Sequence, residues 1–245
     1  MRLKITLKSK KNRLKIPFNY NHIVSAIVYN KIYDLELAQE LHSSQSYKFF
    51  TFSSLHIHKF RLLKDGLLSQ NGTIDFMISS PDDYLIKSLV EGFLEDLTVN
   101  FIGEELLVQK VELLPTPDFE ETVKVKTLSP VIVRTKKEVD GELKTWDLPP
   151  SKEQFYTNLE NNLISKYKEF NKLEETDKKI AISSEMRHVK AKRISIDKGD
   201  QKTFHRGYLM DLVLEGDSDL IKFAYDSGLG EKSALGFGMV DLNNK

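Results

Sequence analysis

Three side chains in the first fifty residues, Tyr29, His42 and Lys48, could together perform acid–base chemistry beside a charge. On the helix predicted between Tyr20 and Leu41, Tyr29 lies off the apolar face, where a ligand could reach its hydroxyl. His42 follows the helix end, where the dipole favours its protonated form, and histidine titrates near neutral pH. A proton acceptor, a proton donor and a cation are what RNA cleavage by its own 2′-hydroxyl needs without a metal.

Each of these residues also has a common structural explanation. A tyrosine at the edge of a core keeps its ring buried and its hydroxyl exposed to solvent. A histidine at a helix end gains from the dipole without any catalytic role. The three therefore become a candidate site through their combination, with Lys48 on a polar loop that leads into a predicted strand.

A second candidate site is the glycine-rich loop near the end of the chain. Four glycines, Gly228, Gly230, Gly236 and Gly238, surround Lys232. Glycine permits positive φ and close approach, so we expect bare backbone amides that suit phosphate oxygens. The alternative is a helix C-cap followed by a tight turn. The spacing matches neither the P-loop nor the dinucleotide-binding pattern.

Basic residues concentrate in two segments although the 36 basic and 36 acidic residues of the chain cancel. The first fifteen residues carry seven Lys and Arg and no acidic residue. A predicted hairpin carries the second group, in which the candidates for RNA phosphate contacts are Arg187, His188, Lys190, Lys192 and Arg193. Charges that keep an exposed strand edge soluble are the alternative explanation for this hairpin.

Composition excludes several classes of protein. With no cysteine among the 245 residues, disulfides, thiolate metal sites and cysteine nucleophiles are excluded. No long apolar run and no signal peptide are present, so we expect a cytoplasmic protein with no membrane partner. His56 and His58 share one face of a strand predicted from Phe49 to Phe60, but spacing offers no third ligand. We therefore expect neither a metal nor another cofactor.

The predicted elements form two similar halves of an α+β fold. Strands alternate at 2–7, 73–78, 99–102 and 106–114, with helices at 20–41 and from Pro81 onward. Tyr84, Leu94 and Leu97 are counted on the buried face of the second helix. Residues 119–245 repeat this order, with a long strand pair turning at 198–200. The order predicts two tandem ferredoxin-like (RRM-like) domains, 1–118 and 119–245, the second ending in the glycine-rich loop.

Several segments together resemble one known family. They are Ile16-Pro-Phe-Asn-Tyr-Asn-His22, Ile27–Asn30, Leu41-His42, Lys48–Ser53 and Gly228–Gly238. They resemble, in order and spacing, the CRISPR repeat-RNA endoribonucleases, the sixth Cas family within the repeat-associated mysterious protein (RAMP) superfamily. One departure is that the loop 43–47 contains no glycine.

The resemblance implies a metal-independent endoribonuclease that cuts CRISPR precursor RNA within its repeat by 2′-hydroxyl attack, giving mature guide RNAs. Tyr29 is then the general base or its stand-in, His42 the general acid or proton shuttle, and Lys48 the electrostatic stabiliser. The alternatives are a non-catalytic repeat-RNA-binding relative and a structural RAMP subunit of an effector complex. A homodimer, and transfer of the product to an effector complex, are two further interactions that the sequence leaves undecided.

Overall fold

The computed structural model describes residues 1–43, 46–139, 141–186, 188–198 and 201–243, with backbone alone at residues 42–43, 139, 197–198 and 201–202. The first half is built on the predicted N-terminal strand, β1 (Arg2–Ser9), whose Leu3, Ile5 and Leu7 are fully buried. Alternation of apolar and polar residues explains this, because successive side chains of a strand point to opposite faces. The apolar face therefore packs against helices.

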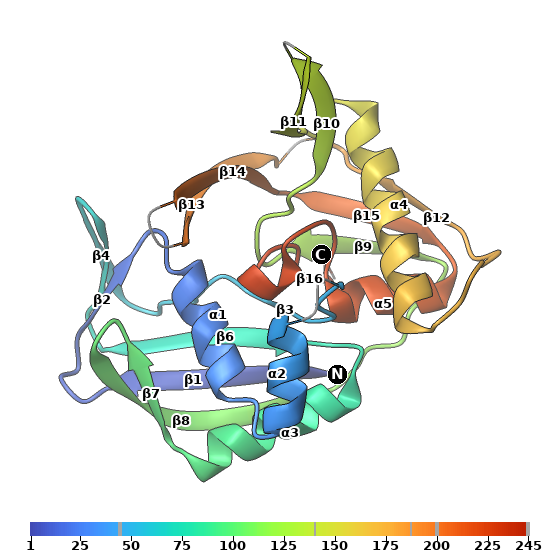
Figure 1. Cartoon of the computed structure of the whole chain (residues 1–245). Helices are drawn as coiled ribbons and strands as arrows, with labels where there is room; N and C mark the ends of the chain where they lie inside the picture. Colours follow the sequence, from blue (N-terminus) through green and yellow to red (C-terminus); the bar gives the residue numbers. More distant parts are fainter. Residues whose placement is uncertain (44–45, 140, 187, 199–200, 244–245) are drawn as a thin grey trace.

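The first sheet has the strand order β3-β6-β1-β8-β7. Its other strands are β3 (Thr51–Phe52), β6 (Thr73–Ser79), β7 (Thr98–Phe101) and β8 (Glu104–Leu114). The helices of this half are α1 (Asn21–Asn30), α2 (Leu35–Ser43) and α3 (Asp83–Glu95), which lie together in Figure 1. Asp82 caps α3 by accepting hydrogen bonds from the amides of Tyr84 and Leu85. Without the extra β7, the order is that of a ferredoxin-like domain.

The second sheet repeats this arrangement in the order β12-β15-β9-β16. Its strands are β9 (Thr122–Thr127), β12 (Ile180–Ser183), β15 (Asp211–Gly216) and β16 (Val240–Leu242), and its helices are α4 (Glu153–Phe170) and α5 (Ser218–Ser227). In both halves the last ferredoxin strand pairs with the first, so the two tandem ferredoxin-like domains are confirmed. The boundary expected at residue 118 lies in the segment between β8 and β9.

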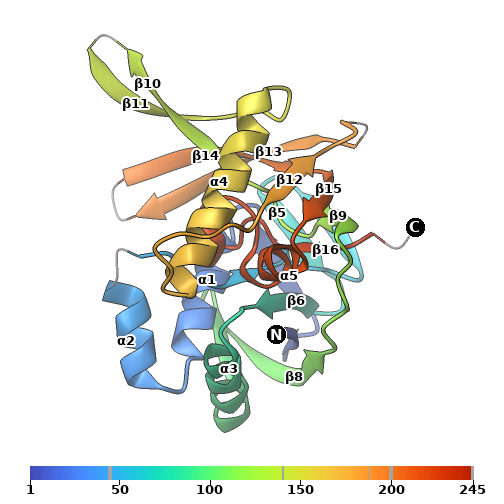
Figure 2. The same ribbon diagram turned by 90° about the vertical axis from the view of Figure 1, so that its right-hand side faces the viewer.

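Three smaller sheets extend the two domains. One has the order β2-β5-β4, and the two others are the hairpins β10–β11 and β13–β14. Their bounds are β2 (Leu14–Pro17), β4 (Phe60–Leu63), β5 (Gly66–Ser69), β10 (Arg134–Val139), β11 (Glu142–Asp147), β13 (Lys190–Lys198) and β14 (Gln201–Leu209). Figures 1 and 2 both show β10–β11 projecting away from the rest of the molecule.

The two domains are joined by a buried arginine at the start of β1. Arg2 is 2% exposed and its guanidinium donates hydrogen bonds to the carbonyl oxygens of Tyr225, at 2.9 Å, and Val240, at 2.8 Å. The guanidinium carbon also lies 3.6 Å from the centre of the Tyr225 ring. A charge of the first domain is therefore satisfied by α5 and β16 of the second.

Several sequence-based expectations about elements were wrong. The strand expected from Phe49 to Phe60 is interrupted in the structure. It pairs with β6 at Thr51–Phe52 and in a bridge at His56, because the Ser54 amide donates to Leu128 of the second domain, and Phe60 already belongs to β4. The long strand pair of the second half is divided between the main sheet and β13–β14. Tyr84, Leu94 and Leu97 are exposed and not in the core.

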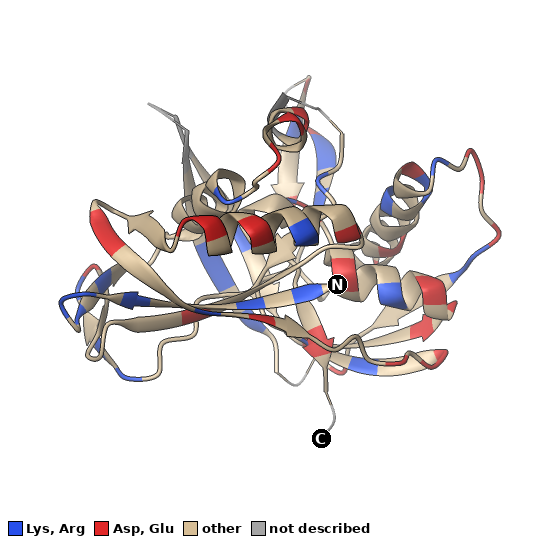
Figure 3. Cartoon of the chain, turned by 90° about the horizontal axis from the view of Figure 1, so that it is seen from below, with Lys and Arg blue, Asp and Glu red and all other residues tan. Residues whose placement is uncertain are grey.

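Three lysines of the basic N-terminal segment have acidic partners. Lys10 pairs with Glu105, Lys11 with Glu104 and Lys15 with Asp65. Figure 3 shows basic and acidic residues interspersed over this side of the molecule. No helix among the described residues is long and apolar enough to cross a membrane.

Candidate functional site

An open cleft of ≈ 850 Å³ lies where the first domain meets the C-terminal loop of the second. Tyr29 and Lys48 line it from the first domain, and Lys232 lines it from the loop. The remaining lining residues are His22, Ser25, Ala26, Asn30, Ala38, Gln39, Ala234 and Leu235. Two residues of the expected catalytic set therefore share one cavity with the lysine of the glycine-rich loop.

Tyr29 reaches the cleft from α1, whose apolar face is formed by Val24, Ile27 and Val28. Its ring packs edge-on against the buried Phe50, with the two ring centres 5.6 Å apart. Burial of the ring raises the pKa of the Tyr29 hydroxyl above its ordinary value. A tyrosine is protonated at neutral pH in any case, and the upward shift further disfavours ionisation, which suits a hydrogen-bonding group better than an ionised base.

Lys48 is held in place by the second domain. The Tyr47 amide donates a hydrogen bond to Glu169 Oε1 of α4 at 3.0 Å, and Ser233 Oγ donates to the Lys48 carbonyl oxygen at 2.9 Å. Burial lowers the pKa of the Lys48 amine, while Glu169 and Glu40 oppose this shift. The lysine consequently faces the cleft from a backbone fixed at two points.

His42 lies near the end of α2, on the helix that contributes Ala38 and Gln39 to the cleft wall. Its side chain lies outside the described residues. A proton-transfer role for His42 therefore stays a prediction from the sequence, although its helix borders the cavity that Tyr29 and Lys48 share.

Three of the four glycine amides in the glycine-rich loop donate hydrogen bonds within the protein, which corrects the expectation of bare amides at these positions. Gly228, Gly230, Gly236 and Gly238 are all buried. The amide of Gly228 donates to Ala224 O, that of Gly236 to Ser233 O and that of Gly238 to Pro130 O. All four glycines have positive φ, and a Cβ at Gly238 would lie 1.8 Å from Leu229 O. Glycine is thus needed here for backbone geometry and close packing, as in the C-cap and turn alternative.

The loop displays Lys232 instead of its amides. Lys232 has a φ of 60° and precedes the 3₁₀ turn η1 (Ser233–Leu235). Asn21 and Ser25 of α1 donate hydrogen bonds to Leu235 O and Ala234 O, both at 2.8 Å. Glu231, the preceding residue, forms an ion pair with Arg134. These contacts fix the position of Lys232 at the cleft.

A buried lysine that sequence reasoning missed donates hydrogen bonds to carbonyl oxygens of the glycine-rich loop. Lys166 of α4 is 2% exposed, and its amine donates to Gly228 O at 2.5 Å and to Gly230 O at 3.4 Å. Burial lowers its pKa to about 7. The signal was present in the sequence, since Lys166 continues the stripe of Phe155, Leu159 and Leu163 on the apolar side of the helix.

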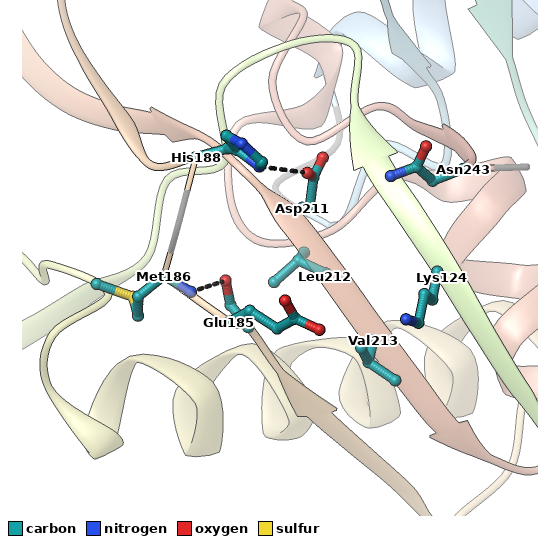
Figure 4. Close-up of a pocket in the computed structure, with 9 residues that line it drawn as sticks. Lys124, Glu185, Met186, His188, Asp211, Leu212, Val213 and Asn243 are labelled. Atoms are coloured by element: carbon teal, nitrogen blue, oxygen red, sulfur yellow. Dashed lines mark hydrogen bonds and ion pairs between the residues drawn. The ribbon is translucent and has the colours of Figure 1, made fainter. Parts of the chain in front are cut away.

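The basic hairpin β13–β14 does not offer a single basic surface. Arg187 lies outside the described residues. His188 lines a separate pocket, where its Nδ1 lies 3.3 Å from Asp211 Oδ2 (Figure 4). Lys190 and Lys192 are exposed on one face of β13, whereas Arg193, on the other face, stacks at 4.2 Å on the Phe204 ring.

Comparison with known proteins agrees with this architecture. Residues 15–112 match the family model described as CRISPR-associated protein Cas6, N-terminal, and residues 114–242 match CRISPR associated protein Cas6, C-terminal. The chain belongs to the Cas6 family.

The similarity to individual Cas6 relatives extends over the full length. CRISPR-associated endoribonuclease Cas6 1 of Methanocaldococcus jannaschii is 38% identical, with 100% of this chain and 95% of the relative covered. Endoribonuclease-like protein Cas6nc of Pyrococcus horikoshii is 31% identical, with 99% of both chains covered. A solved structure titled "An RAMP protein binding different RNA substrates" has a TM-score of 0.85 and 29% identity, with 100% of both chains covered.

Proposed function

We propose that this Cas6 protein cuts CRISPR precursor RNA within its repeat, by metal-independent attack of the 2′-hydroxyl on the adjacent phosphate. The observation that carries the proposal is that Tyr29, Lys48 and Lys232 line one cleft, bordered by the helix that bears His42. The endoribonuclease names of full-length relatives support RNA cleavage as the activity.

The proposed reaction forms one bond and breaks one. The 2′-oxygen loses its proton and bonds to phosphorus, the bond from phosphorus to the 5′-oxygen breaks, and that oxygen takes up a proton. The products are a 2′,3′-cyclic phosphate and a 5′-hydroxyl. Tyr29, a protonated phenol at neutral pH whose raised pKa further disfavours ionisation, orients the 2′-hydroxyl by hydrogen bonding. His42 exchanges the protons, and the Lys48 ammonium offsets charge on the phosphorane.

Lys232 and the exposed lysines of β13 supply the phosphate contacts in this proposal. Lysine binds phosphate as a point charge, which gives affinity without reading the sequence. The exposed Arg193, which stacks on the Phe204 ring, is a further cation that can contact phosphate in this proposal. The guide RNA released by the cut is then available for hand-over to an effector complex.

The test is a single-turnover assay on the host's repeat RNA in excess EDTA, with a matched RNA that carries a 2′-deoxy nucleotide at the cut site. We expect cleavage of the first RNA and none of the second. If both RNAs are cut, 2′-hydroxyl attack is wrong. If neither is cut while binding is tight and falls with salt, the protein is a repeat-binding relative without nuclease activity.

His42→Ala tests the general acid, with His56→Ala as the matched histidine control. His56 is exposed and does not line the cleft. We expect His42→Ala to slow cleavage by about a hundredfold to ten-thousandfold and to leave RNA affinity unchanged. His56→Ala should cleave at the wild-type rate. A loss of affinity alone in His42→Ala would remove His42 from the chemistry.

A further inference from the structure

Two histidines and a buried carboxylate meet on the first domain, apart from the cleft. His56 Nδ1 lies 3.7 Å and His58 Nε2 lies 2.6 Å from the same oxygen, Oδ2 of Asp75. The three ligand atoms all lie within 4.8 Å of one another. Spacing in the sequence showed the two histidines without a third ligand, because Asp75 comes from a strand that pairs with them only in the fold.

The backbone around this cluster is rigid. His56 and Asp75 form an antiparallel bridge, in which the His56 amide donates to Asp75 O at 2.8 Å and the Asp75 amide donates to His56 O at 2.9 Å. The side chain of Thr6, the β1 partner of Asp75, hydrogen-bonds to the carboxylate. Hydrogen-bonded ligand carboxylates of this kind are typical of metal sites, where outer partners orient the ligands.

The histidine side chains have the freedom that a metal requires. Those of His56 and His58 are 68% and 47% exposed, whereas that of Asp75 is 6% exposed. Ligand bonds of about 2.0–2.2 Å in a tetrahedral zinc site separate ligand atoms by about 3.3 Å. The observed 2.6 and 3.7 Å bracket this separation, so small rotations of two exposed rings around a fixed carboxylate would complete the site.

We propose that His56, His58 and Asp75 bind a divalent first-row metal ion of the zinc type, with water in the fourth position. Two imidazoles and one carboxylate suit such borderline ions. Lys4 lines the neighbouring groove together with His56 and Asp75, and its positive charge limits the affinity of the site. The ion is a structural clamp in this proposal, because none of its ligands lines the cleft.

The clamp would act on a segment that touches both domains. Two residues before His56, the Ser54 amide donates to Leu128 O of the second domain at 3.0 Å. A metal that joins residues 56 and 58 to β6 therefore also restrains the crossing from β3 to β4. Its expected effect is greater thermal stability, with no change in the rate of RNA cleavage.

The test uses untagged full-length protein that has been treated with EDTA and then freed of chelator. Co²⁺ is titrated with visible absorption as the readout, and Zn²⁺ by calorimetry and by the shift in melting temperature. We expect one equivalent of each ion to bind and Zn²⁺ to raise the melting temperature. His56→Ala and His58→Ala should each lose at least tenfold in affinity, as loss of even an outer-shell partner costs about 10–100-fold.

His188→Ala is the control, because this exposed histidine pairs with Asp211 in a different pocket. It should bind both ions as the wild type does. The proposal is overturned if the wild type shows no saturable binding, or if both cluster variants bind as tightly as the control. Either result would assign His58 and Asp75 to a simple hydrogen-bonded pair, and neither would bear on RNA cleavage.

Discussion

Replacing Gly236 by alanine should destabilise the protein by about 2–5 kcal/mol. At Gly236 φ is +76°, and a Cβ built there lies 2.1 Å from Cε2 of Phe52, a fully buried ring of β3. A side chain in the left-handed region costs about 1–2 kcal/mol, and forcing a methyl into a packed core costs about 1–3 kcal/mol more. Urea unfolding followed by circular dichroism measures the free energy of unfolding directly.

Gly103→Ala separates the two contributions. Gly103 has nearly the same φ, +74°, but no atom lies within 4 Å of a Cβ built there. Gly103→Ala should therefore lower the free energy of unfolding only by the backbone contribution, about 1–2 kcal/mol. The difference between the two variants measures the overlap with Phe52. Equal losses would show that the ring moves aside without cost and that the packing argument is wrong.

Three further predictions concern charged groups. The pKa of about 7 at Lys166 lies below the ordinary value of 10.5. Between pH 7 and pH 10.5 the unfolded state therefore binds more protons than the folded state. The free energy of unfolding should rise with pH across this window, by at most about 5 kcal/mol. Lys166→Met should abolish this part of the rise in urea unfolding at pH 7, 8.5 and 10; an unchanged slope would contradict the assignment. Arg2→Met should lower the free energy of unfolding by about 2–5 kcal/mol, because two buried carbonyls lose their donor. Lys10→Met, a change at an exposed lysine, should lower it by less than about 1 kcal/mol. Similar losses for both variants in urea unfolding would show that Arg2 does not join the domains. Lys232→Ala should weaken RNA binding. It should also reduce the steepness with which the logarithm of the binding constant falls with the logarithm of the salt concentration, by about 1. An unchanged slope in binding titrations would place the Lys232 amine away from phosphate.

Local patterns in the sequence were sufficient for most elements of the two main sheets and for their order. Alternation at 2–7 predicted β1, and the stripe of Phe155, Leu159 and Leu163 predicted α4, because each reflects burial of one face. From the order of strands and helices, both ferredoxin-like domains followed. Tyr29 was expected off the apolar face of its helix, where a ligand could reach its hydroxyl, and in the structure it lines the cleft together with Lys48.

Features that depend on distant neighbours could not be predicted. The glycine amides were expected to be bare, but Pro130, more than one hundred residues away, accepts from Gly238. The acidic partners of the basic N-terminus, Glu104 and Glu105, come from β8. Likewise, Asp75 reaches His56 only through pairing of β6. Each case needs the register of strands that are remote in sequence, which no local pattern encodes.

The position of Arg2 has a consequence for the way the two domains fold together. Its guanidinium belongs to the first strand of the first domain, yet it is satisfied by the carbonyls of residues 225 and 240 in the second domain. The cleft likewise combines residues 22–48 with residues 232–235. The first domain alone would leave Arg2 without these partners and the cleft incomplete, so the complete cleft forms only when the two domains have docked.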